Sequence, residues 1–214
     1  MLAGVLAACR SPVIEDRAGP FWEAFQHNGF EVSHFKSLEE MLEASDTVVI
    51  ARVRDVAVSR VFQGDAPGDR VPYIRVELVI DRVIAGNAPP VVQLEFLGGG
   101  NEAQAATLAK ELKERVPVQA AIVFLHEKRG DGEAGLYRVT NSTGLWTETA
   151  RARLATPLRG EPPQGTELYA EELANIATID GLLGYLASLA QASAVFCGAE
   201  IHAIRGITAM WQLA

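Results

Sequence analysis

The feature that most constrains the fold is a run of alternating apolar and polar residues at positions 73–81. The apolar members are Ile74, Val76, Leu78 and Ile80, and the polar members are Tyr73, Arg75, Glu77 and Asp81. Successive side chains of a β-strand point to opposite sides. The spacing therefore predicts a strand with one side in a core and the other in water.

The preceding segment, residues 47–61, is rich in β-branched residues and is predicted to be one long strand. Ala51 and Val53 are apolar positions at the spacing of a strand, but the next apolar residue of this set is Val56. The alternation is thus out of phase on the two sides of Arg54–Asp55. This slip predicts a β-bulge there, and a bulge bends a strand.

Turns delimit the alternating strand on both sides. Glycine, proline and aspartate are concentrated at 63–69 before it, and glycine and proline at 86–90 after it. A third strand is predicted after the second turn. Its apolar side consists of Val92, Leu94 and Phe96.

A helix and two further strands are predicted next. Asn101, with Gln104 three residues later, is typical of a helix N-cap, and Pro117 lies beyond the end of this helix. The nearly continuous apolar run 120–125 predicts a strand buried on both sides. A fifth strand is predicted at 136–140.

Three strands, a helix and two more strands, with the first strand long and bent, is the order of the OB-fold, a small five-stranded barrel. The predicted class is therefore mainly β with helices, with an OB-like barrel over residues 37–149. A bent first strand lets five strands close without long exposed edges. An ordinary five-stranded sheet with one covering helix is the alternative.

Residues 1–9 form a short apolar run that ends in small residues and a cysteine. The run is too short to span a bilayer, which takes about 20 apolar residues, but it is typical of the end of a signal peptide. Leu6-Ala7-Ala8-Cys9 resembles the lipobox of bacterial lipoproteins. The resemblance implies that Cys9 carries lipid and anchors the protein to a membrane of the cell envelope, outside the cytoplasm.

A signal peptide begins with a basic segment, and no basic residue precedes this apolar run. We therefore expect either that translation starts further upstream or that the sequence is truncated. An apolar helical turn with a buried cysteine is the alternative. The other cysteine, Cys197, lies near the opposite end of the chain, so a disulfide-stapled secreted framework is excluded.

Residues 10–36 begin as a polar tether and continue into an aromatic-rich stretch. Its aromatic members are Phe21, Trp22, Phe25, Phe30 and Phe35. Pro20 is placed to open a short helix and Gly29 to end it. We expect the aromatic side chains to pack on the domain, with a ligand-stacking platform as the alternative. A capping box at 37–40 begins another short helix.

Residues 150–166, rich in proline and glycine, predict an irregular linker. The C-terminal segment 167–214 is predicted to be helical, with helices at 167–176 and 179–196, the second capped by Thr178. An uncharged stretch dominates the second helix. We expect it to pack on the barrel or on a partner, with a membrane-spanning helix as the alternative.

Four segments of the chain carry a resemblance to known proteins. They are residues 38–53, 73–86, 120–125 and 137–144. Together they resemble a group of bacterial secreted proteins and lipoproteins whose OB-like domain is similar in shape to the tissue inhibitors of metalloproteinases. Those inhibitors chelate the protease zinc with a free N-terminal cysteine and are stapled by disulfides. The barrel region here has no cysteine, so the resemblance implies the fold but not the inhibitory activity.

The major catalytic motifs do not occur in the sequence. No His-Glu-x-x-His, Gly-x-Ser-x-Gly or phosphate-binding glycine loop is present. His27 and His34 could pair on a metal, but we predict no metal, no cofactor and no enzyme activity. Two alternatives stay open: an envelope hydrolase with a site built from His34, His126 and Glu127, and a protease inhibitor without the cysteine chelator.

The formal net charge of −8 disfavours nucleic-acid binding. OB-folds bind ligands across the outer side of their second and third strands. The candidate ligand-binding residues are therefore Tyr73, Arg75, Glu77, Gln93 and Glu95. Their mixed charge favours a protein or glycan ligand. The sequence thus predicts a non-catalytic, membrane-anchored lipoprotein with a binding or scaffold domain.

Overall fold

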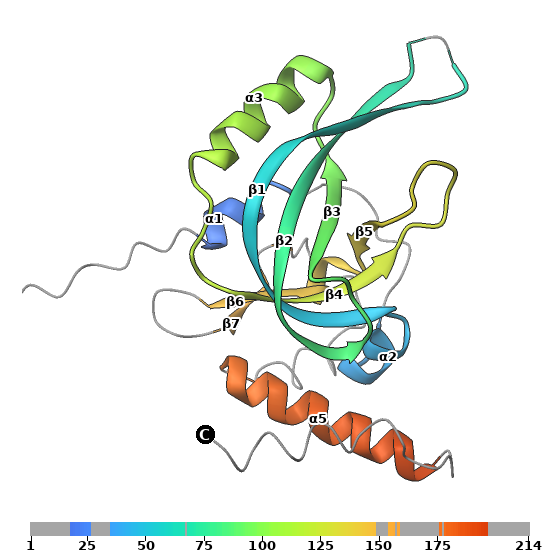
Figure 1. Cartoon of the computed structure of the whole chain (residues 1–214), viewed down its shortest axis with the longest axis vertical. Helices are drawn as coiled ribbons and strands as arrows, with labels where there is room; N and C mark the ends of the chain where they lie inside the picture. The colour runs from blue at the N-terminus through green and yellow to red at the C-terminus, as the bar shows by residue number, and fades with distance from the viewer. Residues whose placement is uncertain are drawn as a thin grey trace, which may run out of the picture.

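The computed structural model of this chain describes residues 18–26, 35–66, 68–148, 154–156, 158, 176 and 178–196. These residues form a mainly β protein with a few helices (Figure 1), which confirms the prediction of a mainly β chain with helices. The strands are β1 (Thr47–Gln63), β2 (Arg70–Gly86), β3 (Val91–Leu97), β4 (Ala121–Glu127), β5 (Leu136–Val139), β6 (Leu145–Glu148) and β7 (Leu154–Ala155). The helices are α1 (Ala18–Glu23), α2 (Leu38–Glu43), α3 (Glu102–Lys113) and α5 (Ile179–Phe196).

The first five strands pair in a closed ring. β1 is antiparallel to β2 along its length and to β4 through residues 47–51. β2 pairs with β3, β3 pairs in parallel with β5, and β5 returns to β4. The predicted order of three strands, a helix and two strands is confirmed.

Two strands were missing from the sequence prediction. β6 pairs with β4, and β7 pairs with β6, so that the sheet has seven strands among the described residues. β7 has only two residues and lies inside the segment expected to be an irregular linker. Strands as short as β6 and β7 contain too few residues to display an alternating pattern.

The predicted bulge in β1 is confirmed. Its register with β2 shifts between Val53 and Asp55, and further shifts occur along the same strand. Each bulge increases the local bend and twist. The bend lets the first part of β1 pair with β4 while the remainder continues along β2 (Figure 1).

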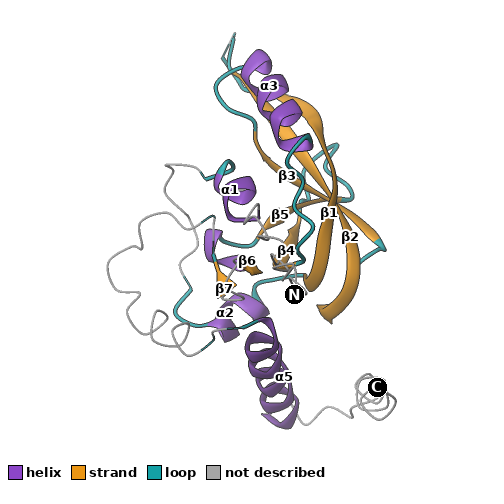
Figure 2. Ribbon diagram, turned by 90° about the vertical axis from the view of Figure 1, so that its left-hand side faces the viewer, coloured by secondary structure: helices purple, strands orange, loops and turns teal. Residues whose placement is uncertain are grey.

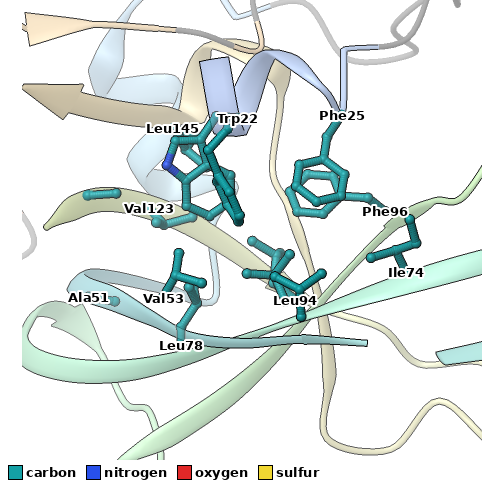
Figure 3. Packing of buried hydrophobic residues seen from close by; sticks show 14 of the residues in the cluster. Trp22, Phe25, Ala51, Val53, Ile74, Leu78, Leu94, Phe96, Val123 and Leu145 are labelled. Atoms are coloured by element: carbon teal, nitrogen blue, oxygen red, sulfur yellow. The ribbon is translucent and has the colours of Figure 1, made fainter. Parts of the chain in front are cut away.

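The main hydrophobic cluster lies between the strands of the ring, and Figure 3 shows part of it. Ile74, Val76 and Leu78 are buried in it, as the alternation predicted. The predicted burial of both sides of β4 is also confirmed. Its members Ala121, Val123 and Leu125 belong to the main cluster, whereas Ile122 and Phe124 belong to a second cluster on its other side.

α1 and the turn that follows it supply aromatic residues to the main cluster. Phe21, Trp22 and Phe25 are buried, and the Phe25 ring stacks on Phe96 with a centroid separation of 4.3 Å (Figure 3). The expectation that this segment packs on the domain is confirmed for these three residues. The helix begins at Ala18 rather than at Pro20, because proline is tolerated within a first helical turn. Gly29 and Phe30 lie outside the described residues.

The second cluster joins α2 and α5 to the outer side of β4 (Figure 2). Its buried members include Leu38 and Met41 of α2 and Leu182 and Leu186 of α5. The predicted packing of the 179–196 helix on the domain is thus confirmed, and the helix expected at 167–176 lies outside the described residues. No helix within the described part of the chain is long and apolar enough to span a membrane.

The predicted helix caps are confirmed. The backbone N–H of Glu40 donates to Ser37 Oγ at 3.1 Å, and that of Gln104 donates to Asn101 Oδ1 at 2.9 Å. Thr178 Oγ1 accepts from the N–H of Gly181 at 3.0 Å. These caps satisfy donors that a helix N-terminus leaves without intrahelical partners.

Candidate ligand-binding face

The residues proposed from the sequence lie together on the outward side of β2 and β3. Arg75 is directly opposite Glu95, and Glu77 is directly opposite Gln93. Tyr73 is on the same side of β2, because it is separated from Arg75 by one residue. We call the outward side of β1, β2 and β3 the β1–β3 outer face. It contrasts with the outer side of β4, which α2 and α5 cover.

One part of the β1–β3 outer face carries exposed ion pairs. Arg52 binds Asp81 through two hydrogen bonds of 2.8 Å, and Arg54 pairs with Glu77. The hydrogen bond from Arg54 holds the pKa of Glu77 below its ordinary value. Such exposed pairs contribute little to stability, because water screens the charges. This part of the face is therefore a solvated, charge-balanced surface.

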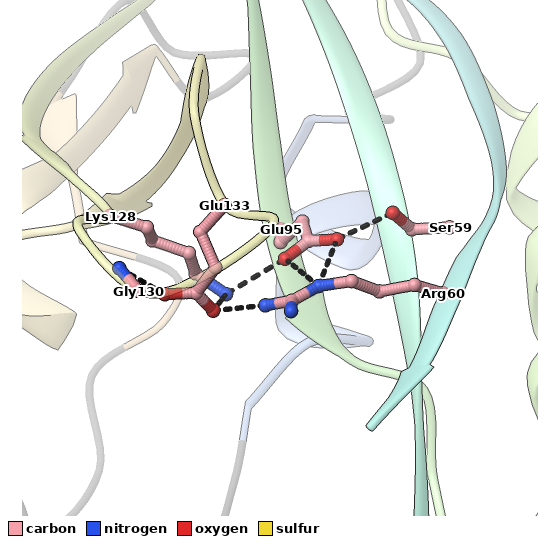
Figure 4. A network of polar contacts seen from close by, with 6 residues as sticks. All are labelled: Ser59, Arg60, Glu95, Lys128, Gly130 and Glu133. Atoms are coloured by element: carbon pink, nitrogen blue, oxygen red, sulfur yellow. Dashed lines mark hydrogen bonds and ion pairs between the residues drawn. The ribbon is translucent and has the colours of Figure 1, made fainter. Parts of the chain in front are cut away.

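Glu95 has a different environment, because its side chain is 0% exposed. It accepts hydrogen bonds from Ser59 Oγ, from Arg60 Nε at 3.2 Å and from Lys128 Nζ at 2.8 Å (Figure 4). Burial acts to raise the pKa of Glu95, but the hydrogen bonds from Lys128 and Ser59 outweigh it, and the pKa lies below its ordinary value. Glu95 is thus an ionised group enclosed by its partners rather than an exposed surface carboxylate.

A second carboxylate, Glu133, joins the same cations from the connection between β4 and β5. It pairs with Arg60, and its Oε2 accepts from the backbone N–H of Gly130 at 3.0 Å (Figure 4). Its Oε1 is 3.9 Å from Lys128 Nζ. The hydrogen bond from Arg60 lowers the pKa of Glu133. Two carboxylates and two cations therefore form a formally neutral network, which we call the Glu95 network.

Tyr73 contacts both cations of the Glu95 network. The guanidinium carbon of Arg60 is 5.2 Å from the Tyr73 ring centroid, and Lys128 Nζ is 4.4 Å from it. These separations are typical of cation–π contacts. Burial raises the pKa of the Tyr73 hydroxyl. The aromatic ring and the two cations thus form one continuous part of the face.

Apolar side chains border the Glu95 network. Leu97 is directly opposite Tyr73, and Phe62 is directly opposite Val71, so all four lie on the outward side. Phe62 is 51% exposed and Leu97 is 39% exposed. Sequence reasoning missed these two residues, although Leu97 continues the outward spacing of Gln93 and Glu95.

The other residues singled out from the sequence do not assemble into a second site within the described residues. Cys9, His27 and His34 lie outside them. His126 Nδ1 lies 3.1 Å from Asp46 Oδ2, and the backbone N–H of Glu127 donates a hydrogen bond of 2.8 Å to the same oxygen. In the same part of the chain, no three His, Cys, Asp or Glu side chains are grouped as metal ligands.

Comparison with known proteins gives no relative. No protein-family model matches the chain, and no curated protein or solved structure is significantly similar to it.

Proposed function

We propose that this chain is a non-catalytic binding protein with an OB-like barrel, anchored by lipid on Cys9 to a membrane of the bacterial cell envelope. In this proposal the β1–β3 outer face binds a protein partner. The closed pairing of five strands and the helix between β3 and β4 support the OB-like assignment. The lipid anchor is supported by the lipobox-like residues before Cys9.

The exposed apolar residues Phe62 and Leu97 beside the Glu95 network carry the proposal of a protein partner. Exposed apolar groups bordered by polar ones are typical of protein contact sites. The outer side of β4 shows the contrasting case, because α2 and α5 bury its apolar residues. A partner that covers Phe62 and Leu97 would gain about 25 cal/mol for each Å² of apolar area removed from water.

Site-specific photocrosslinking in cells tests the binding face. A benzophenone amino acid replaces Phe62 or Leu97, and the control replaces Val118, which is 83% exposed but lies between α3 and β4. We expect a discrete crosslinked protein from positions 62 and 97 and none from 118. Equal crosslinking from all three positions, or none from 62 and 97, contradicts the proposal.

The lipid anchor is tested separately. Cells that express the full-length gene are treated with globomycin, which blocks lipoprotein signal peptidase, and the mature N-terminus is examined by mass spectrometry. We expect a diacylglycerol-modified Cys9 without the drug, precursor accumulation with it, and no lipid on Cys9→Ser. An unmodified Cys9 thiol in the untreated mature protein refutes the anchor and leaves the binding face to be judged by crosslinking.

A further inference from the structure

The two carboxylates of the Glu95 network are held in different ways. Glu95 belongs to β3, and its side chain is fully buried. Glu133 belongs to the connection between β4 and β5, and its side chain is 23% exposed. Both share Arg60 as a partner (Figure 4). Glu95 is therefore a fixed part of the sheet, whereas Glu133 reaches the cations from its edge.

The β4–β5 connection is closed by its own hydrogen bonds. The N–H of Glu133 donates to the carbonyl of Gly130 at 3.0 Å, and that of Leu136 donates to the carbonyl of Glu133 at 2.9 Å. Gly132 has a φ of 72° and Gly135 a φ of 76°, which glycine adopts without strain. The Glu133 side chain can consequently leave Arg60 without breaking a hydrogen bond between strands.

We infer that Glu133 occupies the position of a ligand carboxylate, and that an acidic side chain of an extended peptide displaces it on Arg60 and Lys128. The inference rests on the proposed protein-binding function of the β1–β3 outer face. It adds the chemistry of the ligand. The ligand carboxylate pairs with the two cations, and apolar side chains next to it contact Tyr73, Leu97 and Phe62.

Charge balance favours an exchange of carboxylates over simple opening. Arg60 and Lys128 carry two positive charges, and Glu95 alone balances one of them. If Glu133 leaves without replacement, the mostly buried Arg60 and Lys128 share the single carboxylate of Glu95, and one buried positive charge is left without compensation, which is unfavourable. A ligand carboxylate restores neutrality. The exposed apolar residues favour a peptide over a carboxylated sugar, because a sugar offers few apolar side groups to Phe62 and Leu97.

Two fluorescein-labelled peptides test the exchange. They are Leu-Glu-Val-Leu-amide and a control, Leu-Gln-Val-Leu-amide, in which glutamine replaces the glutamate. Binding is measured by anisotropy for the full chain and for Glu133→Gln, which removes the internal competitor. Glu102→Gln is the matched control, because Glu102 forms an exposed pair with Arg70 at 2.7 Å. We expect Glu133→Gln to bind the Glu peptide about tenfold more tightly than wild type, equivalent to about 1.4 kcal/mol. The Gln peptide and Glu102→Gln should show no such gain.

Amide hydrogen exchange supplies a readout on the unmutated protein. The N–H of Gly130 donates to Glu133, so displacement of Glu133 by the Glu peptide should speed its exchange while β2 amides stay protected. Equal affinity of Glu133→Gln and wild type, or a Gly130 amide that stays protected at saturation, overturns the inference. Tighter binding of oligogalacturonate than of the Glu peptide overturns the peptide assignment. If the exchange or the peptide assignment fails but position 62 still crosslinks to a discrete protein, the proposed protein-binding function is retained and only this inference is refuted.

Discussion

Removal of the Phe25 ring measures how far α1 and the turn that follows it contribute to the stability of the domain. Phe25 is buried, stacks on Phe96 at 4.3 Å and meets Phe21 edge-on at 5.8 Å between centroids. α1 has only six residues and would not persist by itself in water. Its position must therefore come from packing, and the Phe25→Ala variant deletes much of that packing.

The magnitude follows from the loss of a buried aromatic ring. A Phe→Ala change in a packed core costs about 3–5 kcal/mol, from lost transfer free energy and the cavity left behind. The stacked and edge-on contacts add about 0.5–1.5 kcal/mol per pair to simple burial. Relaxation of the short helix into the cavity offsets part of this. We expect a loss of about 3–4 kcal/mol, a large share of the 5–15 kcal/mol of a typical domain.

Urea unfolding followed by tryptophan fluorescence measures this loss, with Trp22 and Trp146 as buried reporters. Phe62→Ala is the matched control, because it deletes the same side chain from an exposed position. We expect the control to change the free energy of unfolding by less than about 1 kcal/mol. A Phe25→Ala loss no larger than that of the control would refute the reasoning that the segment of α1 and its following turn is an integral part of the core.

Three further changes probe the network and a helix cap. Glu95→Gln should lower the free energy of unfolding by about 3 kcal/mol, since it leaves buried Lys128 with only the more distant Glu133 as a charged partner. A Glu95→Gln/Lys128→Met double variant should recover part of this loss in urea titrations. Because the folded-state pKa values of Glu95 and Glu133 are lowered, their contribution is present above the ordinary glutamate pKa of about 4.5 and is lost as the pH falls through the lower folded values. Unfolding followed from about pH 7 to about pH 3 should show a smaller loss of stability for Glu95→Gln than for the wild type. Asn101→Ala should cost about 1 kcal/mol through the lost N-cap of α3, whereas an unchanged midpoint would mean that the cap is not needed.

The strands of the ring could be predicted because each carries a pattern with a physical cause. In β2 one side is buried and the other is not, so Ile74, Val76 and Leu78 alternate with polar residues. In β4 both sides are buried by different clusters, and the sequence shows a continuous apolar run instead. β7 could not be found, because its two residues gain their strand conformation only from pairing with β6.

The candidate site was only partly predictable. Arg60 and Glu133 are 73 positions apart, and Lys128 and Glu95 are 33 apart, so their contacts depend on how the β4–β5 connection returns to β3. Local sequence carries no signal for such pairs. The outward position of Phe62 could not be predicted for another reason. The register shift between Val58 and Val61 changes which residues of β1 point outward. Glu95 was correctly placed on the outward side by alternation, but its burial was not visible.

The two outer sides of the ring are covered by different chemistry, and this difference bears on function. The outer side of β4 is covered by apolar side chains of α2 and α5. Exposing these side chains to water would lower the stability of the fold, because their burial is favourable. The Glu95 network instead covers part of β3 with ionic groups, which gain little net stability from burial but can be rehydrated when they separate. A cover made of Arg60, Lys128 and Glu133 is therefore the kind that a ligand can exchange. Its position beside exposed Phe62 and Leu97 is the reason to look for the partner there and not on the side of β4.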